Sequence, residues 1–429
     1  MPAHMTSQAQ VRRELVPIVL GADILVYSYV RSFCETYALE HKPIVLTTMD
    51  VKIVSSSTLC DYRVIEGVDK DEMLVEQLCE IGRDLCEQGL RGIVLGSGDW
   101  YARTLSKHKQ TLEEWIYIPY NDFELLDMLT QKDAFQALCE KSGLGHPKTL
   151  ELDCSADAPE WNRDMQGIAF PCIAKPSNSA AWHYAEFEGK RKIHEPASFE
   201  ELEQLYTTLR EHTSYDRKLL VQDMIPGGDD SILSLTAYID AHGTATACVL
   251  GQVVLQDHSP QALGNPVCIV NAFHSPQLAE RRGAMHELVE RAVQMIRAEG
   301  YRGYANFDVK YDERDGSLNL FEVNTRPGRN TFYVSLSGMP FVKPIVEDVV
   351  LGHALPAAPV PEKFCFTCIP ASVVWRYAGT PELRDYVLRA YREGWARNPL
   401  YFDADCLEHG LWAQATTMNQ IRKFPRYMK

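Results

Sequence analysis

Short apolar runs alternate with helical patterns along the first third of the chain. Residues 16–20, 44–48 and 92–95 are rich in β-branched and other apolar side chains. Between the last two runs, one helical face carries four apolar residues and ends before Gly89: Leu74, Leu78, Ile81 and Leu85. Strands that alternate with helices in this way are typical of a parallel sheet. The pattern therefore predicts an N-terminal parallel α/β domain over residues 1–125.

The pattern changes after residue 125, where longer strands and a hairpin are expected. The predicted elements are, in chain order, a helix at 131–142, a strand at 168–176, a helix that Ser198 caps, strands at 218–225, 232–239 and 245–255, a helix at 277–299 and a hairpin at 303–324. Three prolines between Leu355 and Pro361 indicate a linker. We therefore expect an α/β protein whose second domain, at 126–354, is of the α+β kind, followed by a C-terminal appendage at 355–429.

The composition is that of a globular protein with a sizeable core, since 45% of the 429 residues are hydrophobic and 24% are charged. The 43 basic and 58 acidic residues give a net charge of −15, which argues against binding nucleic acid or an anionic membrane with the whole surface. The twelve cysteines form no framework, and no apolar run approaches the roughly 20 residues that span a bilayer. These features predict a cytoplasmic enzyme without a transmembrane segment.

The predicted hairpin gathers oxygen-bearing side chains. Asp308 lies in its first strand, and Glu322 and Asn324 share one face of its second strand. A turn centred near Asp315, between the two strands, pairs Asp308 with Glu322. Two carboxylates and an amide oxygen then converge near Arg326. Carboxylates this close need a cation between them, and such ligands suit Mg²⁺ that also binds water and phosphate. A solvated hairpin with alternating polar residues is the alternative interpretation.

Two lysines and a strand end precede the hairpin. Lys132 opens the helix at 131–142, and Lys175 ends an apolar strand just before a proline. A lysine fixed in this way is placed to face an anion, although each alone is more often a surface lysine. The strand at 218–225 runs into a Pro-Gly-Gly turn and two acids. Its end has backbone groups for an adenine edge, and the acids that follow can reach a ribose.

The order of these features resembles the ATP-grasp superfamily of carboxylate–amine ligases over roughly residues 1–350. The resemblance implies an ATP-grasp domain of two lobes at 126–354, with a lid at about 146–225 that excludes water. It implies that phosphates of ATP are held by Lys132 and Lys175. It places adenine at a hinge formed by Gln222, Asp223, Met224 and Ile225, and the ribose at Asp230. It also implies that Mg²⁺ is held by Asp308, Glu322 and Asn324, with Arg326 facing the transferred phosphoryl group.

Two features depart from the usual pattern of that superfamily. The acid at the hinge is Asp223, where glutamate is more usual. The loop after Lys175 contains Ser177, Asn178 and Ser179 but no glycine, whereas the loop that covers phosphates is usually rich in glycine.

The chain resembles the D-aspartate ligase group more narrowly. The resemblance rests on the segments Leu20-Gly-Ala-Asp23, Lys175-Pro-Ser-Asn178, Arg326-Pro-Gly-Arg329 and Asn419-Gln-Ile-Arg-Lys-Phe424. It implies that the β-carboxylate of D-aspartate is activated as an acyl phosphate and joined to a side-chain amine of a peptidoglycan precursor. Arg329 and Arg31 are then candidates for binding the second carboxylate, and a surface salt bridge is the alternative for each.

Other functions remain open at this stage. One is an ATP-grasp ligase for another amino acid or a dipeptide, and another is a nucleotide-binding regulator without turnover. The donor's stereochemistry, the amine acceptor and the oligomeric state, a homodimer included, are not determined by the sequence.

Overall fold

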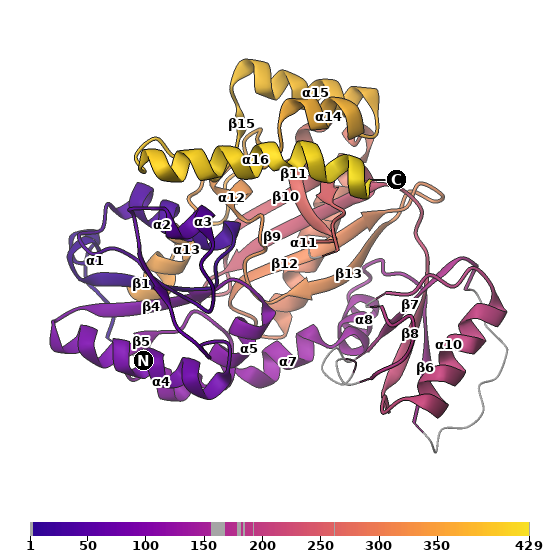
Figure 1. Cartoon of the computed structure of the whole chain (residues 1–429), viewed down its shortest axis with the longest axis horizontal. Helices are drawn as coiled ribbons and strands as arrows, with labels where there is room; N and C mark the ends of the chain where they lie inside the picture. The colour runs from indigo at the N-terminus through magenta and orange to yellow at the C-terminus, as the bar shows by residue number, and fades with distance from the viewer. Residues whose placement is uncertain are drawn as a thin grey trace. The chain divides into compact units, whose positions relative to one another are not determined.

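The computed structural model divides the chain into two compact units (Figure 1). It describes residues 3–155, 168–177, 182, 185–191, 193–260 and 262–428. The first unit comprises Met1–Asp127, Gly228–Val309 and Val323–Lys429, and the second comprises Met128–Gly227 and Lys310–Glu322. The segment predicted as a lid, 146–225, therefore belongs to the second unit.

The first unit begins with a five-stranded parallel sheet in the order β3-β2-β1-β4-β5. Its elements are α1 (Gln8–Glu14), β1 (Leu15–Leu20), α2 (Ile24–Tyr37), β2 (Ile44–Thr47), α3 (Lys52–Ser55), β3 (Asp61–Val64), α4 (Asp71–Glu87), β4 (Arg91–Gly96), α5 (Asp99–Lys107), α6 (Lys109–Leu112), β5 (Ile116–Tyr117) and α7 (Phe123–Thr130). These elements confirm the predicted parallel α/β class.

The central strand β1 is buried on both faces, which explains its uninterrupted apolar sequence. Leu15 and Val19 pack into one core with α2, whereas Ile18 and Leu20 pack into the core on the other face with α4. The apolar face of α4 provides Leu74, Leu78, Ile81 and Leu85 to that second core, as its spacing predicts.

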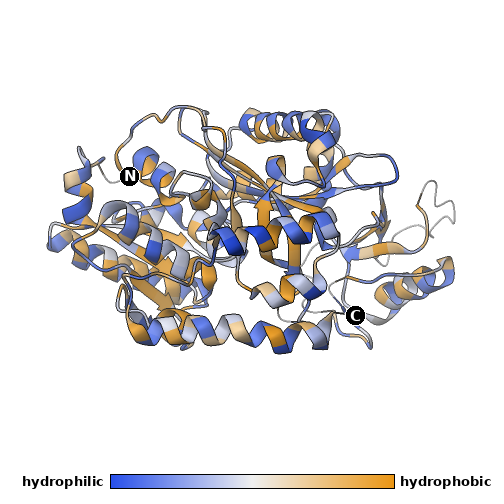
Figure 2. Cartoon of the chain, turned by 90° about the horizontal axis from the view of Figure 1, so that it is seen from above, coloured by the Kyte–Doolittle hydropathy of each residue, from blue (hydrophilic) through white to orange (hydrophobic). Residues whose placement is uncertain are grey.

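A seven-stranded sheet has the order β13-β12-β9-β10-β11-β14-β15. Most of its strands belong to the first unit, whereas the end of β12 and most of β13 belong to the second. Its strands are β9 (Ile232–Ile239), β10 (Ala245–Asp257), β11 (Asn265–Asn271), β12 (Gly303–Tyr311), β13 (Leu318–Asn324), β14 (Cys365–Thr367) and β15 (Ala396–Arg397). Figure 2 shows that these strands are largely hydrophobic. The helices of this part are α11 (Arg282–Ala298), α12 (Phe332–Leu336), α13 (Val342–Ile345), α14 (Ala371–Tyr377), α15 (Pro381–Glu393) and α16 (Leu407–Tyr427). The helix expected at 277–299 begins only at Arg282, because residues 279–281 form a 3-10 turn.

The C-terminal residues extend this sheet. β14 pairs with β11 in antiparallel orientation and β15 pairs with β14 in parallel orientation. Side chains of α14 and α15, with Phe424 of α16, pack over these strands in one apolar cluster. Within the described ranges, no helix is both long enough and apolar enough to cross a membrane.

The second unit contains a three-stranded antiparallel sheet in the order β6-β8-β7, drawn in magenta in Figure 1. Its elements are α8 (Lys132–Lys141), β6 (Thr149–Asp153), β7 (Cys172–Pro176), α10 (Phe199–His212) and β8 (Lys218–Asp223). The side chain of Ser198 accepts a hydrogen bond from the backbone N–H of Glu201 and caps α10, as the sequence predicts. The buried face of α10 packs Leu202 and Leu209 against the sheet.

Candidate active site

Two acidic residues follow the neighbouring strands β1 and β4. Asp23 Oδ1 accepts hydrogen bonds from the backbone N–H groups of Leu25 and Val26, which begin α2, and from Ser97 Oγ. Asp99 is the first residue of α5, directly after β4. The chain winds outward from β1 in one direction and from β4 in the other, so both acids lie at the switch point of the sheet. Ligands of open α/β sheets bind at such points.

Two arginines of the turn after β13 face these acids. Arg326 donates from Nε and Nη2 to the two carboxylate oxygens of Asp99, at 2.9 and 3.2 Å. Arg329 Nε lies 3.6 Å from Asp23 Oδ2. The side chain of Arg326 is only 15% exposed. Burial is the largest single effect and lowers the pKa of Arg326, but the carboxylates of Asp99, Asp308 and Asp23 together outweigh it, so the pKa is raised. Arg326 is therefore a permanently charged, oriented guanidinium.

A line of polar contacts continues from Arg326 to the hairpin. Arg326 Nη2 donates to Asn324 Oδ1 at 3.4 Å, and Asn324 Nδ2 donates to Asp308 Oδ2 at 3.3 Å. The structure thus connects three residues singled out in the sequence, Arg326, Asn324 and Asp308, with Asp99. Their connection leads from the end of the parallel sheet to the oxygen atoms proposed to bind metal.

The turn that carries the arginines is fixed by close packing at Gly328. A Cβ atom there would lie 2.8 Å from Asn330 Oδ1 and 3.0 Å from Asn306 Oδ1, so a larger side chain would displace the turn. Asn306 in turn donates from Nδ2 to Ser234 Oγ and Thr236 Oγ1 on β9, at 2.9 and 2.8 Å. The turn is thereby held against β12 and β9, and Arg326 and Arg329 start from a rigid base.

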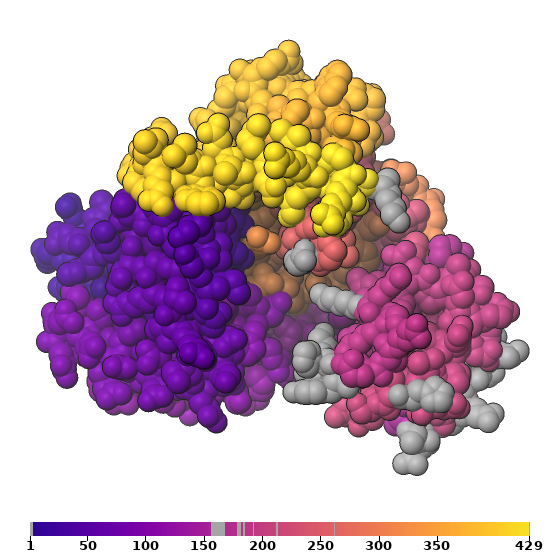
Figure 3. Space-filling model, in the orientation of Figure 1, coloured from indigo at the N-terminus to yellow at the C-terminus, as the bar shows by residue number. Residues whose placement is uncertain are grey.

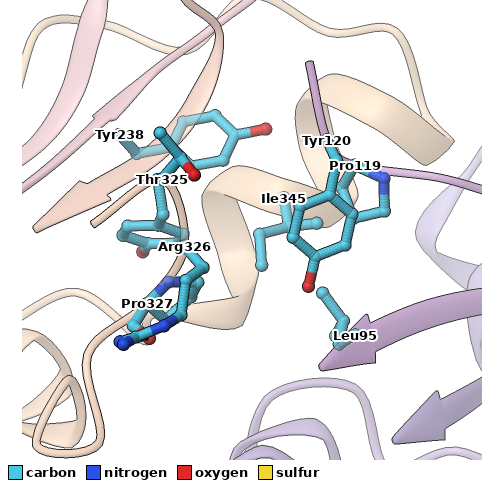
Figure 4. A pocket seen from close by; sticks show the side chains of 9 residues that line it. Leu95, Pro119, Tyr120, Tyr238, Thr325, Arg326, Pro327 and Ile345 are labelled. Carbon is cyan, nitrogen blue, oxygen red and sulfur yellow. Dashed lines mark hydrogen bonds between the residues drawn. The ribbon is translucent and has the colours of Figure 1, made fainter. Parts of the chain in front are cut away.

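Behind Arg326 the molecule is nearly solid. Figure 4 shows a small cavity with Arg326 and Pro327 on one side and Pro119, Tyr120 and Leu95 on the other. Its volume is about 10 Å³, the room that a single water molecule needs. This cavity is therefore too small for a substrate.

The two predicted phosphate-binding lysines belong to the second unit. Lys132 begins α8, and its Nζ lies 3.4 Å from the backbone oxygen of Pro176, the residue after Lys175. Lys175 lies in β7, opposite Leu220 of β8. Both lysine side chains are partly exposed. The structure therefore brings Lys132 close to the end of β7, where Lys175 lies. In the loop that follows, Asn178 and Ser179 fall outside the described residues.

The predicted adenine hinge lies at the end of β8. Gln222 is buried and donates from Nε2 to Thr149 Oγ1 at 2.8 Å, so its side chain joins β8 to β6. Asp223 accepts a hydrogen bond from Arg314 Nη2 at 2.9 Å. Of the two remaining hinge residues, Ile225 is buried and Met224 is partly exposed. The hinge acid thus has a fixed cationic partner, which the sequence analysis did not identify.

The predicted ribose ligand, Asp230, lies in the first unit just before β9. Its Oδ2 accepts from Gln277 Nε2 at 3.3 Å, and the carboxylate rests against the backbone of Gly379. Asp230 lines an open cavity of about 440 Å³ together with Tyr377 and Tyr427. Cavities of this size accommodate small organic ligands.

The predicted metal ligands are divided between the units. Asp308 and Asn324 belong to the first unit, and Glu322, exposed on β13, belongs to the second. In the part of the chain that the structure describes, no three His, Cys, Asp or Glu side chains gather closely enough to hold a metal ion by themselves.

Arg31 has a structural role instead of the substrate contact considered from the sequence. Its guanidinium donates to the backbone oxygens of Pro399 and Tyr401 at 3.0 and 2.8 Å, pairs with Glu35, and stacks over the ring of Phe332. These contacts attach α2 to the segment before α16. The sequence could not predict this role, because Arg31 and its backbone partners lie about 370 residues apart in the chain.

Comparisons with known proteins show the family and the fold class. The chain is 32% identical to the D-aspartate ligase of Enterococcus faecium (strain Aus0004) over 345 residues, which cover 79% of this chain and 77% of that protein. It is 24% identical to a D-alanine–D-alanine ligase of Actinobacillus pleuropneumoniae serotype 5b (strain L20), over 67% of this chain and 86% of that protein. No protein-family model matches the sequence.

Among solved structures, the fold is similar to that of an ADP complex of purK, an N5-carboxyaminoimidazole ribonucleotide synthetase. The TM-score is 0.57 at 12% sequence identity, and the match covers 85% of this chain and 82% of that one. At this level of identity the likeness concerns the fold alone, and it confirms the predicted α/β class.

Proposed function

The chain belongs to the same family as D-aspartate ligase, within the ATP-grasp carboxylate–amine ligases, and we propose that it joins D-aspartate to a peptidoglycan precursor. In this reaction ATP activates the β-carboxylate of D-aspartate, and the acyl group passes to a side-chain amine of the precursor. ADP and phosphate are released. The twelve free cysteines fit a reducing cytoplasm, where ATP and such precursors are available.

The observation that carries this proposal is the double arginine–aspartate arrangement at the end of β1 and β4. An aspartate molecule presents one ammonium and two carboxylates, and each needs an opposite charge when it leaves water. Asp23 is the proposed partner of the ammonium group. Arg329 is the proposed partner of the α-carboxylate, since it is 40% exposed and has only a 3.6 Å contact with Asp23. Arg326 then faces the β-carboxylate that reacts.

The proposed ATP contacts follow the residues singled out in the sequence. Lys132 and Lys175 bind phosphate oxygens, and the hinge at residues 222–225 binds adenine through its backbone. The open cavity at Asp230 supports a role for that carboxylate in binding the ribose hydroxyls. The ion pair between Asp223 and Arg314 keeps the hinge acid in one orientation.

The oxygen donors of the hairpin fit Mg²⁺. Asp308 and Asn324 lie side by side, and Glu322 is accessible on β13. One or two carboxylates with remaining positions for water and phosphate are what Mg²⁺ requires. When bound, Mg²⁺ would neutralise phosphate oxygens of ATP.

The chain's own residues then position two successive transfers. A carboxylate oxygen of the donor attacks the γ-phosphorus of ATP, the bond from that phosphorus to the bridging oxygen breaks, and ADP leaves. The amine, which must arrive deprotonated, attacks the carbonyl carbon of the acyl phosphate; phosphate leaves, and the nitrogen loses one proton. Arg326 offers a fixed positive charge to the phosphoryl group and to the oxyanion that follows. Because Asp99 orients it beforehand, this charge need not reorganise during the reaction.

A hydroxylamine assay tests this proposal without the precursor. The protein is incubated with ATP, Mg²⁺, hydroxylamine and one amino acid at a time, with D- and L-aspartate in parallel. ADP and aspartyl hydroxamate with D-aspartate alone are the expected result. Turnover with a different amino acid would support ligase activity but refute D-aspartate as the donor. Absence of ADP release with every acid, and also with amine-bearing peptides, would contradict ligase activity.

A further inference from the structure

The C-terminal helix α16 has a second apolar face that the fold does not use. Its inner face buries five residues against the first unit: His409, Ala413, Thr417, Gln420 and Phe424. On another face, four large apolar side chains are strongly exposed: Leu407 by 80%, Leu411 by 60%, Met418 by 50% and Ile421 by 40%. Figure 3 shows α16, in yellow, uncovered along its length, and Figure 2 shows hydrophobic residues recurring along it. In a monomer these apolar side chains remain in contact with water, and contiguous exposed apolar patches commonly mark interaction sites.

The exposed residues follow the spacing of a coiled-coil seam. With the exposed Gln414 and Pro425, the positions 407, 411, 414, 418, 421 and 425 alternate by four and three residues. Helices with this repeat pack against a second helix through that seam, and one polar residue in it fixes the register. We propose that the occupant is α16 of a second copy of this chain, in antiparallel orientation about a two-fold axis at Gln414.

This register is self-complementary. With Gln414 opposite the partner's Gln414, Leu407 lies opposite the partner's Ile421, and Leu411 lies next to the partner's Met418. The two amides at the axis can each donate and accept a hydrogen bond. Each of the four large apolar residues of the stripe thus meets an apolar residue of the partner, as an interface with two-fold symmetry requires.

Charge complementarity favours the antiparallel arrangement. Glu408 and Arg422 are exposed and flank the seam on the same side, two turns either way from Gln414. Antiparallel packing places Glu408 close to the partner's Arg422, twice per dimer, whereas parallel packing puts these positions on opposite sides of the seam and forms neither pair. Lys423 does not compete for Glu408, because it is paired with Asp257 at 2.9 Å.

The surface beside the seam offers a hollow for the most exposed side chain. A groove of about 510 Å³ is lined by Val373 and Trp375 of α14 and by Ile421 and Pro425 of α16. The guanidinium of Arg384 stacks on the Trp375 ring at 4.9 Å and holds it in place. Since Leu407 lies opposite the partner's Ile421 in this register, Leu407 enters the partner's groove.

Disulfide trapping at the axis tests the register directly. A cysteine on a two-fold axis meets its own copy, so Gln414→Cys is expected to form a covalent dimer under mild oxidation. Asn419→Cys, exposed on the same helix but off the seam, is the matched control and should resemble the wild type, which already has partly exposed cysteines. No covalent dimer, or equal cross-linking of both variants, would overturn the proposal.

Charge exchange tests the pairing independently by sedimentation velocity over a range of concentrations. Glu408→Arg and Arg422→Glu should each raise the dimer dissociation constant severalfold, and the double variant should restore it. Leu411→Glu should give a monomer that still unfolds cooperatively. Its rate of ADP release from ATP should equal that of the wild type. The proposal would be refuted if the wild type stayed monomeric at high concentration. Binding of that monomer to anionic vesicles through this face would equally refute the dimer.

Discussion

Arg326 combines burial with several fixed polar contacts. It is nearly buried, it forms a two-point ion pair with Asp99, and it also contacts Asn324. Burying a guanidinium costs free energy unless its donors are satisfied, and a fork-to-carboxylate pair fixes its direction as well as its charge. The geometry of Arg326 therefore matters as much as its charge.

We predict that Arg326→Lys lowers kcat by about 100-fold, because lysine keeps the positive charge but loses the planar fork. The KM for ATP should change much less, since Lys132, Lys175 and the hinge at residues 222–225 provide most of the proposed ATP contacts. Steady-state ADP release measures both constants. Arg63→Lys is a suitable control, as Arg63 also pairs with an aspartate, Asp61, but on an exposed edge strand. A fully active Arg326→Lys variant would contradict the role of Arg326.

The hinge provides a second prediction at this scale. Arg314 bonds both Asp223 and Asp312, and its hydrogen bond is the largest contribution that lowers the pKa of the Asp312 carboxyl. Arg314→Gln should raise the KM for ATP by about tenfold, because one charge-assisted hydrogen bond is lost. The kcat should change little. Arg217→Gln, an exposed arginine of the same unit, is the control. Equal effects on kcat and KM would argue that Arg314 acts elsewhere than in ATP binding.

At the scale of elements, α16 is attached to the N-terminal sheet through one carboxylate. Asp405, directly before α16, accepts hydrogen bonds from Tyr27 on α2 and from Ser57 and the backbone of Thr58 after α3. Its side chain is fully buried. A charge removed from water in this way is stable only while these donors remain in place.

Replacement of Asp405 by asparagine should lower the free energy of unfolding by about 2–3 kcal/mol near neutral pH. Burial acts to raise the pKa of Asp405, but the hydrogen bonds from Ser57, Cys406, Thr58 and Tyr27 outweigh it and leave that pKa lowered. A lowered folded-state pKa gives stability that is present above the unfolded value of about 3.9 and is lost as the pH falls through the folded value. Thermal unfolding at pH 7 and below pH 4 should therefore show a difference between wild type and variant that shrinks in acid. A difference independent of pH would contradict this account.

The elements also show what the sequence could and could not predict. The parallel strands β1, β2 and β4 were predictable because complete burial leaves an apolar run. The apolar run from Phe364 to Ile369 likewise predicts the strand that contains β14, whereas the two residues of β15 carry too little periodicity to be assigned. The contacts of Arg326 with Asp99 and of Arg314 with Asp223 join residues 227 and 91 positions apart, so no local pattern could reveal them. Residue types suggested the chemistry, and only the fold identified the partners.

At the scale of the whole molecule, the proposed function requires an acidic protein to bind acidic substrates. The chain carries a net charge of −15, whereas the proposed substrates, ATP and aspartate, are both anions. In this proposal, binding depends on local positive groups, Lys132, Lys175, Arg326 and Arg329, and on metal ions rather than on the overall field. Removal of a metal ligand should then abolish most of the turnover and change the stability of the fold little.

We expect Glu322→Gln to reduce ligase activity by at least about 100-fold, since an amide is a weaker ligand for Mg²⁺ than a carboxylate. Its melting temperature should equal that of the wild type, because Glu322 is exposed. Glu313→Gln, an exposed glutamate in the same hairpin, should leave activity unchanged. If Glu322→Gln kept full turnover, the assignment of the metal ligands would be wrong.

The central claim is that a carboxylate is activated by transfer of the γ-phosphoryl group, and oxygen labelling tests it most directly. D-aspartate labelled with ¹⁸O in its β-carboxylate is turned over with ATP and hydroxylamine, and the inorganic phosphate is analysed by mass spectrometry. An acyl phosphate leaves one carboxylate oxygen on phosphorus, so each phosphate should contain one ¹⁸O atom. Label recovered in AMP, or phosphate without label, would contradict the account.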